Sequence, residues 1–273
     1  MSSSIRCMDF YNLHQSGTFV LVNVHDVGTA LLAEAAGAKA LGTTSGGFAY
    51  TVGQKDAAGA LTRDQSIKHA TQICAAVDIP VSIDAENGWG HSPEDVAETI
   101  RMLIDCGAAG ASIEDWSGDS DIGFYGVNLA TERIHAAVDT AKEYGDSFVI
   151  CARADRVMHE GMDALDESLE RLRSFAKVGA DCLYAPGPAD EATHRRVVTE
   201  SGGPVNALFQ MNGKLTIEDA TQWGIRRVSV GSSLYQATMA VFLEMVTRAV
   251  KDGVLDVDIP PLDYEFIESL SHK

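Results

Sequence analysis

Short apolar runs alternate with longer amphipathic stretches along almost the whole chain. Runs of this length that are rich in branched side chains are typical of buried strands. The stretches between them begin with helix-capping patterns, such as Thr62 with Gln65 three positions later, or Ser92 followed by Pro93. The pattern predicts about eight strands, at residues 19–24, 38–43, 80–83, 108–113, 147–152, 180–185, 204–208 and 227–230.

The regular alternation also indicates the fold class. Eight strand-helix units are typical of a closed parallel (β/α)8 barrel of the TIM type, which is an α/β fold. An open doubly wound sheet would gain from a glycine-rich phosphate loop, and neither GxGxxG nor GxxxxGK[ST] follows any predicted strand. No Pro/Ser linker interrupts the alternation. We therefore predict one domain over residues 1–273, with the barrel at about 11–253 and a C-terminal helical tail at about 254–273.

Composition narrows the class of partner. The chain has 273 residues, with 21 Lys+Arg against 39 Asp+Glu and a net charge of -18. This charge repels nucleic acids and anionic membranes, so neither is an expected partner, and an anionic ligand would depend on local cations. The N-terminus lacks a signal-peptide pattern, and no apolar run reaches the roughly 18 residues of a membrane span. Because the five cysteines form no CxxC pair, we expect a cytoplasmic protein without disulfides or a zinc site.

Polar side chains collect at the ends of the predicted strands, where barrels of this type carry their active sites. Asp84 and Glu86 lie two residues apart after the third strand, so they project to the same side. If they packed near Glu114 from the fourth strand without a cation, repulsion and desolvation would raise the pKa values of all three carboxyls. A divalent metal with hard oxygen ligands removes that conflict, which indicates Mg²⁺, with Mn²⁺ as the alternative.

Five motifs follow one another along the chain: TTSGG, DAENGWG, SIED, ARAD and RRVSVGS. In this order and spacing they resemble the isocitrate lyase/phosphoenolpyruvate mutase superfamily, over roughly residues 11–253. The resemblance implies an α/β barrel whose final helix is exchanged between subunits of a homo-oligomer, either a dimer or a tetramer. It also implies a small-molecule carboxylate substrate and chemistry through a Mg²⁺-bound enolpyruvate formed from a 2-oxo acid or its adduct.

The resemblance also assigns roles to individual residues. Asp84 matches the direct metal ligand, and Glu86 stands where many members of the superfamily have Asp. Arg153 matches a carboxylate-binding arginine, whose planar guanidinium would supply local positive charge. The predicted metal-site acids are Asp84, Glu86 and Glu114, the predicted catalytic residues are Asp56, Glu114 and Arg153, and the predicted substrate-binding residues are Ser45, Gly46, Gly47, Asp84, Arg153 and Asn206.

The loop after the fourth strand departs from the lyases of this superfamily. Isocitrate and methylisocitrate lyases carry a catalytic Cys there, whereas residues 116–133, WSGDSDIGFYGVNLATER, contain no Cys, Lys or His. The mutases and phosphonopyruvate hydrolases have Lys and Asn groups in that loop and a His after the sixth strand, where this chain has Pro186-Gly187. The enolate-forming residues remain, which favours a Mg²⁺-dependent C–C lyase or decarboxylase acting on an oxaloacetate-like 2-oxo acid.

Several alternatives stay open from the sequence. The chain could carry out C–P chemistry of the phosphonopyruvate hydrolase or phosphoenolpyruvate mutase type, act as a metal-dependent aldolase, or bind a 2-oxo acid without turnover. Tyr125 could supply a proton to an enolate or pack over the barrel mouth. His25 could act as an acid or serve as a structural histidine beside Asp26.

Overall fold

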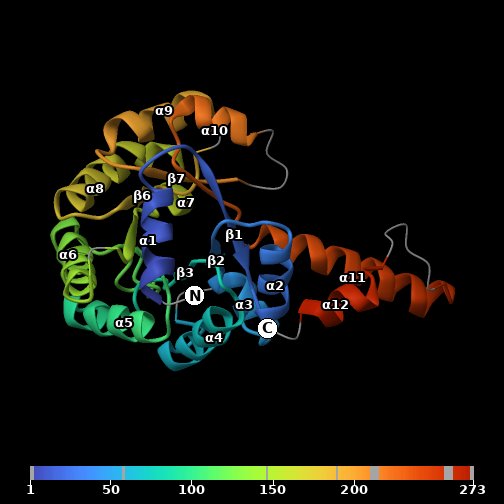
Figure 1. Cartoon of the computed structure of the whole chain (residues 1–273). Coiled ribbons are helices and arrows are strands. Elements are labelled where there is room, and N and C mark those ends of the chain that lie inside the picture. Colours follow the sequence, from blue (N-terminus) through green and yellow to red (C-terminus); the bar gives the residue numbers. More distant parts are fainter. Residues whose placement is uncertain are drawn as a thin grey trace.

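Eight parallel strands form a closed barrel in the computed structural model, which describes residues 3–56, 59–145, 147–188, 190–209, 215–254 and 261–270. Neighbours in the sequence pair in the barrel, and β8 closes it against β1 (Figure 1). This confirms the predicted (β/α)8 barrel. The strands are β1 Phe19–Val24, β2 Leu41–Thr43, β3 Val81–Asp84, β4 Gly110–Glu114, β5 Val149–Arg153, β6 Cys182–Tyr184, β7 Val205–Leu208 and β8 Arg227–Ser229.

Helices surround the barrel, and the predicted capping patterns start two of them. Thr62 and Ser92 each accept a hydrogen bond from the backbone three residues on, before α4 and α5. Among the described helices, none combines the length and apolar character needed to cross a membrane. The helices are α1 Ser3–Leu13, α2 Val27–Ala35, α3 Ser45–Thr51, α4 Arg63–Ala76, α5 Pro93–Asp105, α6 Val127–Glu143, α7 Arg156–Glu160, α8 Leu165–Lys177, α9 Glu191–Glu200, α10 Ile217–Trp223, α11 Ser233–Asp252 and α12 Tyr264–Leu270.

Two strands are only half as long as the sequence pattern predicts. The predicted strand at 38–43 forms only at Leu41–Thr43, and the one at 180–185 only at Cys182–Tyr184. In both cases a glycine with positive φ ends the preceding helix, at +89° for Gly37 and +98° for Gly179. The chain uses the next few residues, 38–40 and 180–181, to reach the sheet, so these residues lie outside the strands.

The N-terminal helix α1 closes one end of the barrel. Its Phe10 is fully buried and packs with Phe19 and Val149, which stand at the starts of β1 and β5. This contact also explains Gly110 at the start of β4, because a Cβ there would lie 2.8 Å from the ring of Phe10. The polar strand ends therefore face the opposite mouth.

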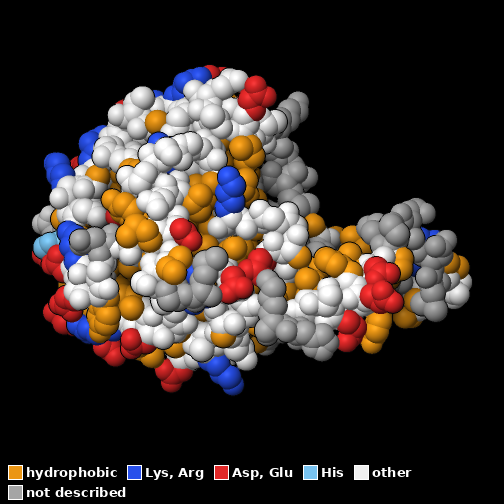
Figure 2. Space-filling model, viewed as in Figure 1, with side chains coloured by type: hydrophobic (Ala, Val, Ile, Leu, Met, Phe, Trp, Pro, Cys, Tyr) orange, Lys and Arg blue, Asp and Glu red, His pale blue; other side chains and the backbone are white. Residues whose placement is uncertain are grey.

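The C-terminal helices leave the barrel. No residue of α11 is buried, and the helix projects away from the barrel wall (Figure 1). Its side chains Phe242, Leu243 and Val250 are 62%, 66% and 79% exposed, and hydrophobic side chains line the visible face of this arm (Figure 2). The helix α12 contacts α2. Residues 255–260 and 271–273 of the predicted tail lie outside the described residues, and the exchange of the arm between subunits stays a prediction.

Candidate active site

The C-terminal ends of β2 to β5 bring four predicted site residues together at the barrel mouth. In the strand register Asp84 pairs with Ser112, and Glu114 pairs with Arg153. Ser45 follows β2 and begins α3. The parallel register thus converts residues far apart in the sequence into neighbours.

Asp84 is held from two sides. Its Oδ2 accepts hydrogen bonds from the backbone N–H of Ser45 at 3.1 Å and from the Ser45 hydroxyl at 2.8 Å. Its Oδ1 lies 3.0 Å from Nη1 of Arg153. The Asp84 backbone N–H donates to the hydroxyl of Thr43 at 2.9 Å. The carboxylate that the sequence predicts as the metal ligand therefore connects the end of β2 with the end of β5.

The two glycines after Ser45 form the first turn of α3, which the sequence did not predict. A Cβ on Gly46 would lie 2.6 Å from Cγ of Asp56, and a Cβ on Gly47 would lie 2.6 Å from Cγ2 of Thr44. Only glycine permits these close approaches. Asp56 is thereby placed against the Ser45 segment, and burial together with the charge of Asp84 raises the pKa of its carboxyl.

Arg153 faces three carboxylates rather than one. Besides the contact with Asp84, its Nη2 lies 2.6 Å from Oδ2 of Asp155 and 3.1 Å from Oε2 of Glu114. The guanidinium side chain is 13% exposed and lies 5.3 Å from the centre of the Tyr184 ring. A substrate carboxylate at this arginine would have to share or replace one of these acids.

Asp155 belongs to a buried network that extends behind Arg153. Its backbone N–H donates to Oδ1 of Asp115 at 2.8 Å, and Oδ2 of Asp115 lies 3.1 Å from Nη1 of Arg171. The same Nη1 donates to the carbonyl of Tyr125 at 2.7 Å. Two ion pairs, Arg171–Asp115 and Asp155–Arg153, are thus joined through the Asp155 backbone N–H, which fixes the orientation of Arg153.

Glu86 and Glu114 carry the excess negative charge of the site. Glu86 is buried, and its Oε2 has no hydrogen-bond partner within the described residues. Burial and the charge of Asp84 raise the pKa of Glu86 to about 7. Burial also raises the pKa of Glu114 well above its ordinary value, although Arg153 opposes the shift. Both carboxyls therefore resist ionisation in the absence of a further cation besides Arg153.

The acids at the mouth offer the oxygen ligands that a hard divalent cation prefers, although they do not form a complete coordination shell. Asp84, Glu86 and Glu114 offer carboxylate oxygens in a site with one cation, Arg153. Within the described ranges, no three acidic, His or Cys side chains stand close enough together to hold a metal. Mg²⁺ commonly takes one or two protein carboxylates and completes its coordination shell with water, so a complete set of protein ligands is not required. The unpartnered oxygen of Glu86 is the observation that agrees with the fit.

Asn206 lines the same mouth at greater depth. With Asp84, Arg153 and Ser229 it borders a narrow polar cavity of about 60 Å³. Its Nδ2 donates to Ser229 Oγ at 2.9 Å, and its Oδ1 accepts from Arg227 Nε at 2.8 Å. Sequence reasoning missed Arg227, a buried arginine on β8, because an arginine that pairs with an amide leaves no acidic partner to find in the sequence.

Neither Tyr125 nor His25, the two candidate proton donors, faces the acidic cluster. The Tyr125 side chain is 2% exposed, its hydroxyl lies 2.7 Å from His91 Nδ1, and its ring lies under Arg133. The ring of His25 packs edge-on against Tyr235 with ring centres 5.0 Å apart. These contacts support packing for Tyr125 and a structural role for His25.

The loop after β4 forms a short hairpin instead of an extended flap. Trp116 and Phe124 form an antiparallel bridge, and the Ser117 N–H donates to the carbonyl of Gly123 at 3.1 Å. The Trp116 ring stacks on His159 of α7 with centres 4.7 Å apart. The loop that lacks the lyase cysteine is therefore closed on itself and packed against its neighbour.

Comparison with known proteins identifies the class to which this barrel belongs. Residues 10–250 match the family model described as phosphoenolpyruvate phosphomutase, and the chain belongs to this family. This confirms the resemblance to the isocitrate lyase/phosphoenolpyruvate mutase superfamily found in the sequence motifs.

Three similar proteins place the chain within the superfamily. It is 32% identical over 223 residues to 2-methylisocitrate lyase of Escherichia coli (strain K12), which covers 79% of this chain and 72% of that protein. A solved structure from Burkholderia cenocepacia J2315 is 37% identical, with a TM-score of 0.93 over 99% of this chain and 97% of that one. The structure of oxaloacetate acetylhydrolase with its product oxalate has a TM-score of 0.86 at 25% identity, over 97% and 93% of the two chains. The superfamily therefore includes C–C lyases with this fold.

Proposed function

We propose that this protein is a Mg²⁺-dependent enzyme, with Mn²⁺ as the alternative metal, that breaks a C–C bond in a small oxaloacetate-like acid through an enolpyruvate-type intermediate. The reaction is either lyase cleavage or decarboxylation. The observation that carries the proposal is the position of Asp84 between Ser45 and Arg153 at the mouth of the barrel. The similarity to 2-methylisocitrate lyase and oxaloacetate acetylhydrolase supports C–C bond cleavage.

Each residue has a distinct role in this proposal. Arg153 binds and orients the substrate carboxylate, and the Ser45 segment holds the 2-oxo oxygen. Mg²⁺, held by Asp84 and through waters by Glu86 and Glu114, would supply polarisation of the 2-oxo group. In decarboxylation the bond to the C4 carboxylate breaks, CO2 leaves and the electron pair stays on C3 as the enolate of a 2-oxo acid. In lyase cleavage of a 2-hydroxy acid a carboxylate takes the hydroxyl proton, the 2-oxo acid leaves and the electron pair goes to C3 of the other fragment. Asp56 or Glu114, whose pKa values are raised, then delivers a proton to the resulting carbon.

Charge at the mouth disfavours the C–P alternative. A phosphonate or phosphoryl group would add two negative charges beside Asp84, Glu114 and Asp155, which already surround the Arg153 guanidinium. Transferring a phosphoryl group requires several donors or cations around its oxygens. A substrate with carboxylates as its only anions fits this mouth better.

Incubation with a panel of 2-oxo acids and substituted malates tests the proposal. We expect Mg²⁺-dependent turnover of an oxaloacetate-like acid, followed by NMR, and exchange of pyruvate C3 hydrogens in deuterated water. Isocitrate and methylisocitrate should not be cleaved, because the loop cysteine is missing. Saturable binding of 2-oxo acids without any product would instead support the non-catalytic alternative, and robust isocitrate cleavage would show that another residue replaces the cysteine.

The exposed arm leads us to propose a homo-oligomer, either a dimer or a tetramer. Burying side chains such as Phe242 and Leu243, now more than 60% exposed, would stabilise association by roughly 2 kcal/mol each. Light scattering at micromolar concentration should give a mass of at least twice 29.1 kDa. A monomeric mass for the whole chain would contradict the proposal.

A further inference from the structure

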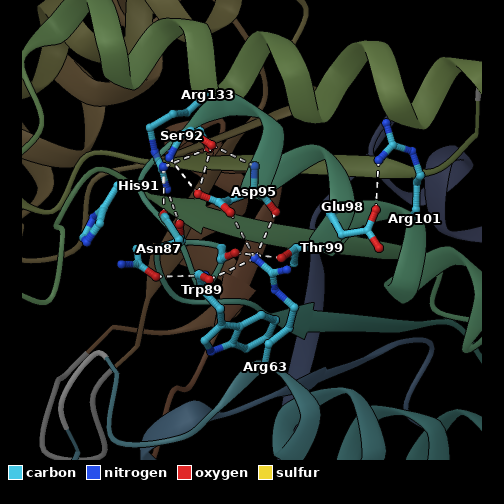
Figure 3. Close-up of polar contacts among 12 residues, drawn as sticks. Arg63, Asn87, Trp89, His91, Ser92, Asp95, Glu98, Thr99, Arg101 and Arg133 are labelled. Atoms are coloured by element: carbon cyan, nitrogen blue, oxygen red, sulfur yellow. Dashed lines mark hydrogen bonds and ion pairs between the residues drawn. The ribbon is translucent and has the colours of Figure 1, made fainter.

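The β3–α5 connection, residues 85–92, is held by an arginine from a different helix. Arg133 of α6 is 1% exposed and is among the largest fully buried side chains. Its Nη1 donates to the carbonyls of Gly90 at 2.9 Å and Ser92 at 3.4 Å, and its Nη2 donates to the carbonyl of Asn87 (Figure 3). One guanidinium thus contacts three backbone carbonyls along the connection.

Arg133 differs from the buried arginines Arg153 and Arg171 in its partners. Arg153 and Arg171 form ion pairs with carboxylates. Arg133 forms none within the described residues, and its guanidinium carbon lies 4.2 Å from the centre of the Tyr125 ring. A buried charge without a counter-ion is expensive, so stabilising the fold alone would be better served by a neutral side chain of similar size.

The connection that Arg133 holds has an unusual backbone. Glu86 and Trp89 have φ values of +47° and +53°, and they are the non-glycine residues with positive φ in the described chain. Each such residue costs about 1–3 kcal/mol and persists where its surroundings determine the conformation. Asn87 lies between them, and its side chain accepts from the Trp89 N–H at 2.9 Å and donates to the Ser117 carbonyl at 2.5 Å.

The conformation of Glu86 decides where its carboxylate lies. With this backbone the Glu86 carboxyl is buried with its Oε2 unpartnered among the described residues, where it feels the charge of Asp84, and the Glu86 carbonyl accepts a hydrogen bond from the Glu114 N–H at 2.9 Å. The Asn87 carbonyl, one peptide further, is the group that Arg133 holds. A relaxed connection would let Glu86 return to negative φ and leave the cluster.

We propose that Arg133 is a positioning residue for the cation site: by holding the Asn87 carbonyl it keeps Glu86 in the left-handed conformation and thereby sets the affinity for a divalent cation. This inference rests on the proposed function, because it assumes that the acidic cluster binds the metal. The role requires arginine, because the planar fork reaches three carbonyls at once while its face covers a ring. Lysine offers three donors at a single point.

The test compares Mn²⁺ affinity in wild type, Arg133→Lys and Arg133→Met, with Arg101→Met as the matched control. Arg101 is an exposed arginine on α5 whose Nη1 lies 3.0 Å from Glu98 (Figure 3). Affinity is measured by calorimetry and electron paramagnetic resonance well below the melting temperature, with circular dichroism as the check on folding. We expect a loss of about tenfold or more in Arg133→Met, a smaller loss in Arg133→Lys, and no change in Arg101→Met.

A double-mutant cycle separates positioning from a general structural effect. If Arg133 acts through Glu86, adding Arg133→Lys to Glu86→Gln should weaken Mn²⁺ binding little further. Unchanged Mn²⁺ affinity in a folded Arg133→Met protein would overturn the inference. If that variant does not fold, unchanged affinity in Arg133→Lys would overturn it instead. Failure of the wild type to bind Mn²⁺ is a different result, since it would overturn the metal-dependent function and this role of Arg133 with it.

Discussion

The two halves of the barrel mouth differ in whether their buried charges have counter-ions. On the β4–β5 side, Arg153 pairs with Asp155 and Arg171 pairs with Asp115, and the Asp155 backbone N–H joins the two pairs, with each contact within 3.1 Å. On the β3 side, Glu86 has a buried oxygen without a partner. The two arginine–aspartate pairs are balanced by their own side chains, whereas Glu86 leaves negative charge uncompensated.

This difference indicates which half already has its counter-ions and which half is suited to bind a cation. A balanced buried network resists rearrangement, which suits the orientation of an arginine that must recognise a carboxylate. A group of buried acids without counter-ions destabilises the folded protein, and binding of a divalent cation would remove that destabilisation. Asp84 connects the halves, because its two oxygens face Ser45 and Arg153 separately.

Removing the connection between the halves should have the largest effect. Asp84→Ala deletes the carboxylate that both sides share, so we expect Mg²⁺ binding to fall below detection in calorimetry and turnover to be lost. Glu114→Gln should weaken binding only about tenfold, because that contact is predicted to pass through water. Unchanged Mg²⁺ affinity in Asp84→Ala would show that the metal binds elsewhere.

The sequence predicts the fold and most members of the site because both depend on periodic patterns. Apolar runs set the eight strands, and a parallel barrel then brings all strand ends to one mouth, where Ser45, Asp84, Glu114 and Arg153 do lie together. The helical start at Ser45-Gly46-Gly47 was missed, because glycine has low helix propensity and the close approach of Asp56 is a tertiary effect.

Arg133 and the pairing pattern of Arg153 could not be predicted for a different reason. Every residue has a backbone carbonyl, so an arginine that donates to carbonyls has no partner that can be recognised in the sequence. Arg133 on α6 therefore appears in the sequence as an ordinary surface charge on an amphipathic helix. The three carboxylates around Arg153 come from the ends of β3 and β4 and from the start of α7, and side-chain direction at these positions is set by packing rather than by spacing.

The second prediction removes the cation that pairs with Asp115 on the β4–β5 side. Arg171→Met leaves Asp115 buried beside Asp155 without its counter-ion, and we expect the free energy of unfolding to fall by about 3–5 kcal/mol in urea at pH 8. The exposed pair between Arg195 and Glu191, at 2.8 Å, provides the control. Arg195→Met should cost less than about 1 kcal/mol. Equal losses in the two variants would contradict the contrast between buried and exposed pairs.

The third prediction removes the uncompensated carboxylate of Glu86, and its outcome depends on pH. Because the pKa of Glu86 is raised to about 7 in the folded protein, the folded state keeps the proton that the unfolded state loses near pH 4.5. Stability from this group is therefore present below pH 4.5 and is lost as pH rises toward 7, by up to about 3 kcal/mol. Without metal, Glu86→Gln should match wild type near pH 5 and be more stable at pH 8.

Saturating Mg²⁺ should reverse this order at pH 8, because the cation binds the ionised carboxylate of the wild type and stabilises its folded state. Urea unfolding at pH 5 and pH 8, with EDTA and with Mg²⁺, gives the four comparisons. A variant that is less stable than wild type at pH 8 in EDTA would mean that Glu86 is already compensated in the free protein.

The smallest effect should come from the loop beside the two halves. Tyr125→Phe removes the hydroxyl that lies 2.7 Å from His91 Nδ1 but keeps the ring under Arg133. The free energy of unfolding should fall by about 1 kcal/mol, the usual net value of one hydrogen bond. Turnover and its pH profile should stay unchanged, because the hydroxyl points to His91 rather than into the acidic cluster. A tenfold loss of kcat at unchanged Mg²⁺ affinity would show instead that Tyr125 delivers the proton, and would place the loop within the reacting part of the mouth.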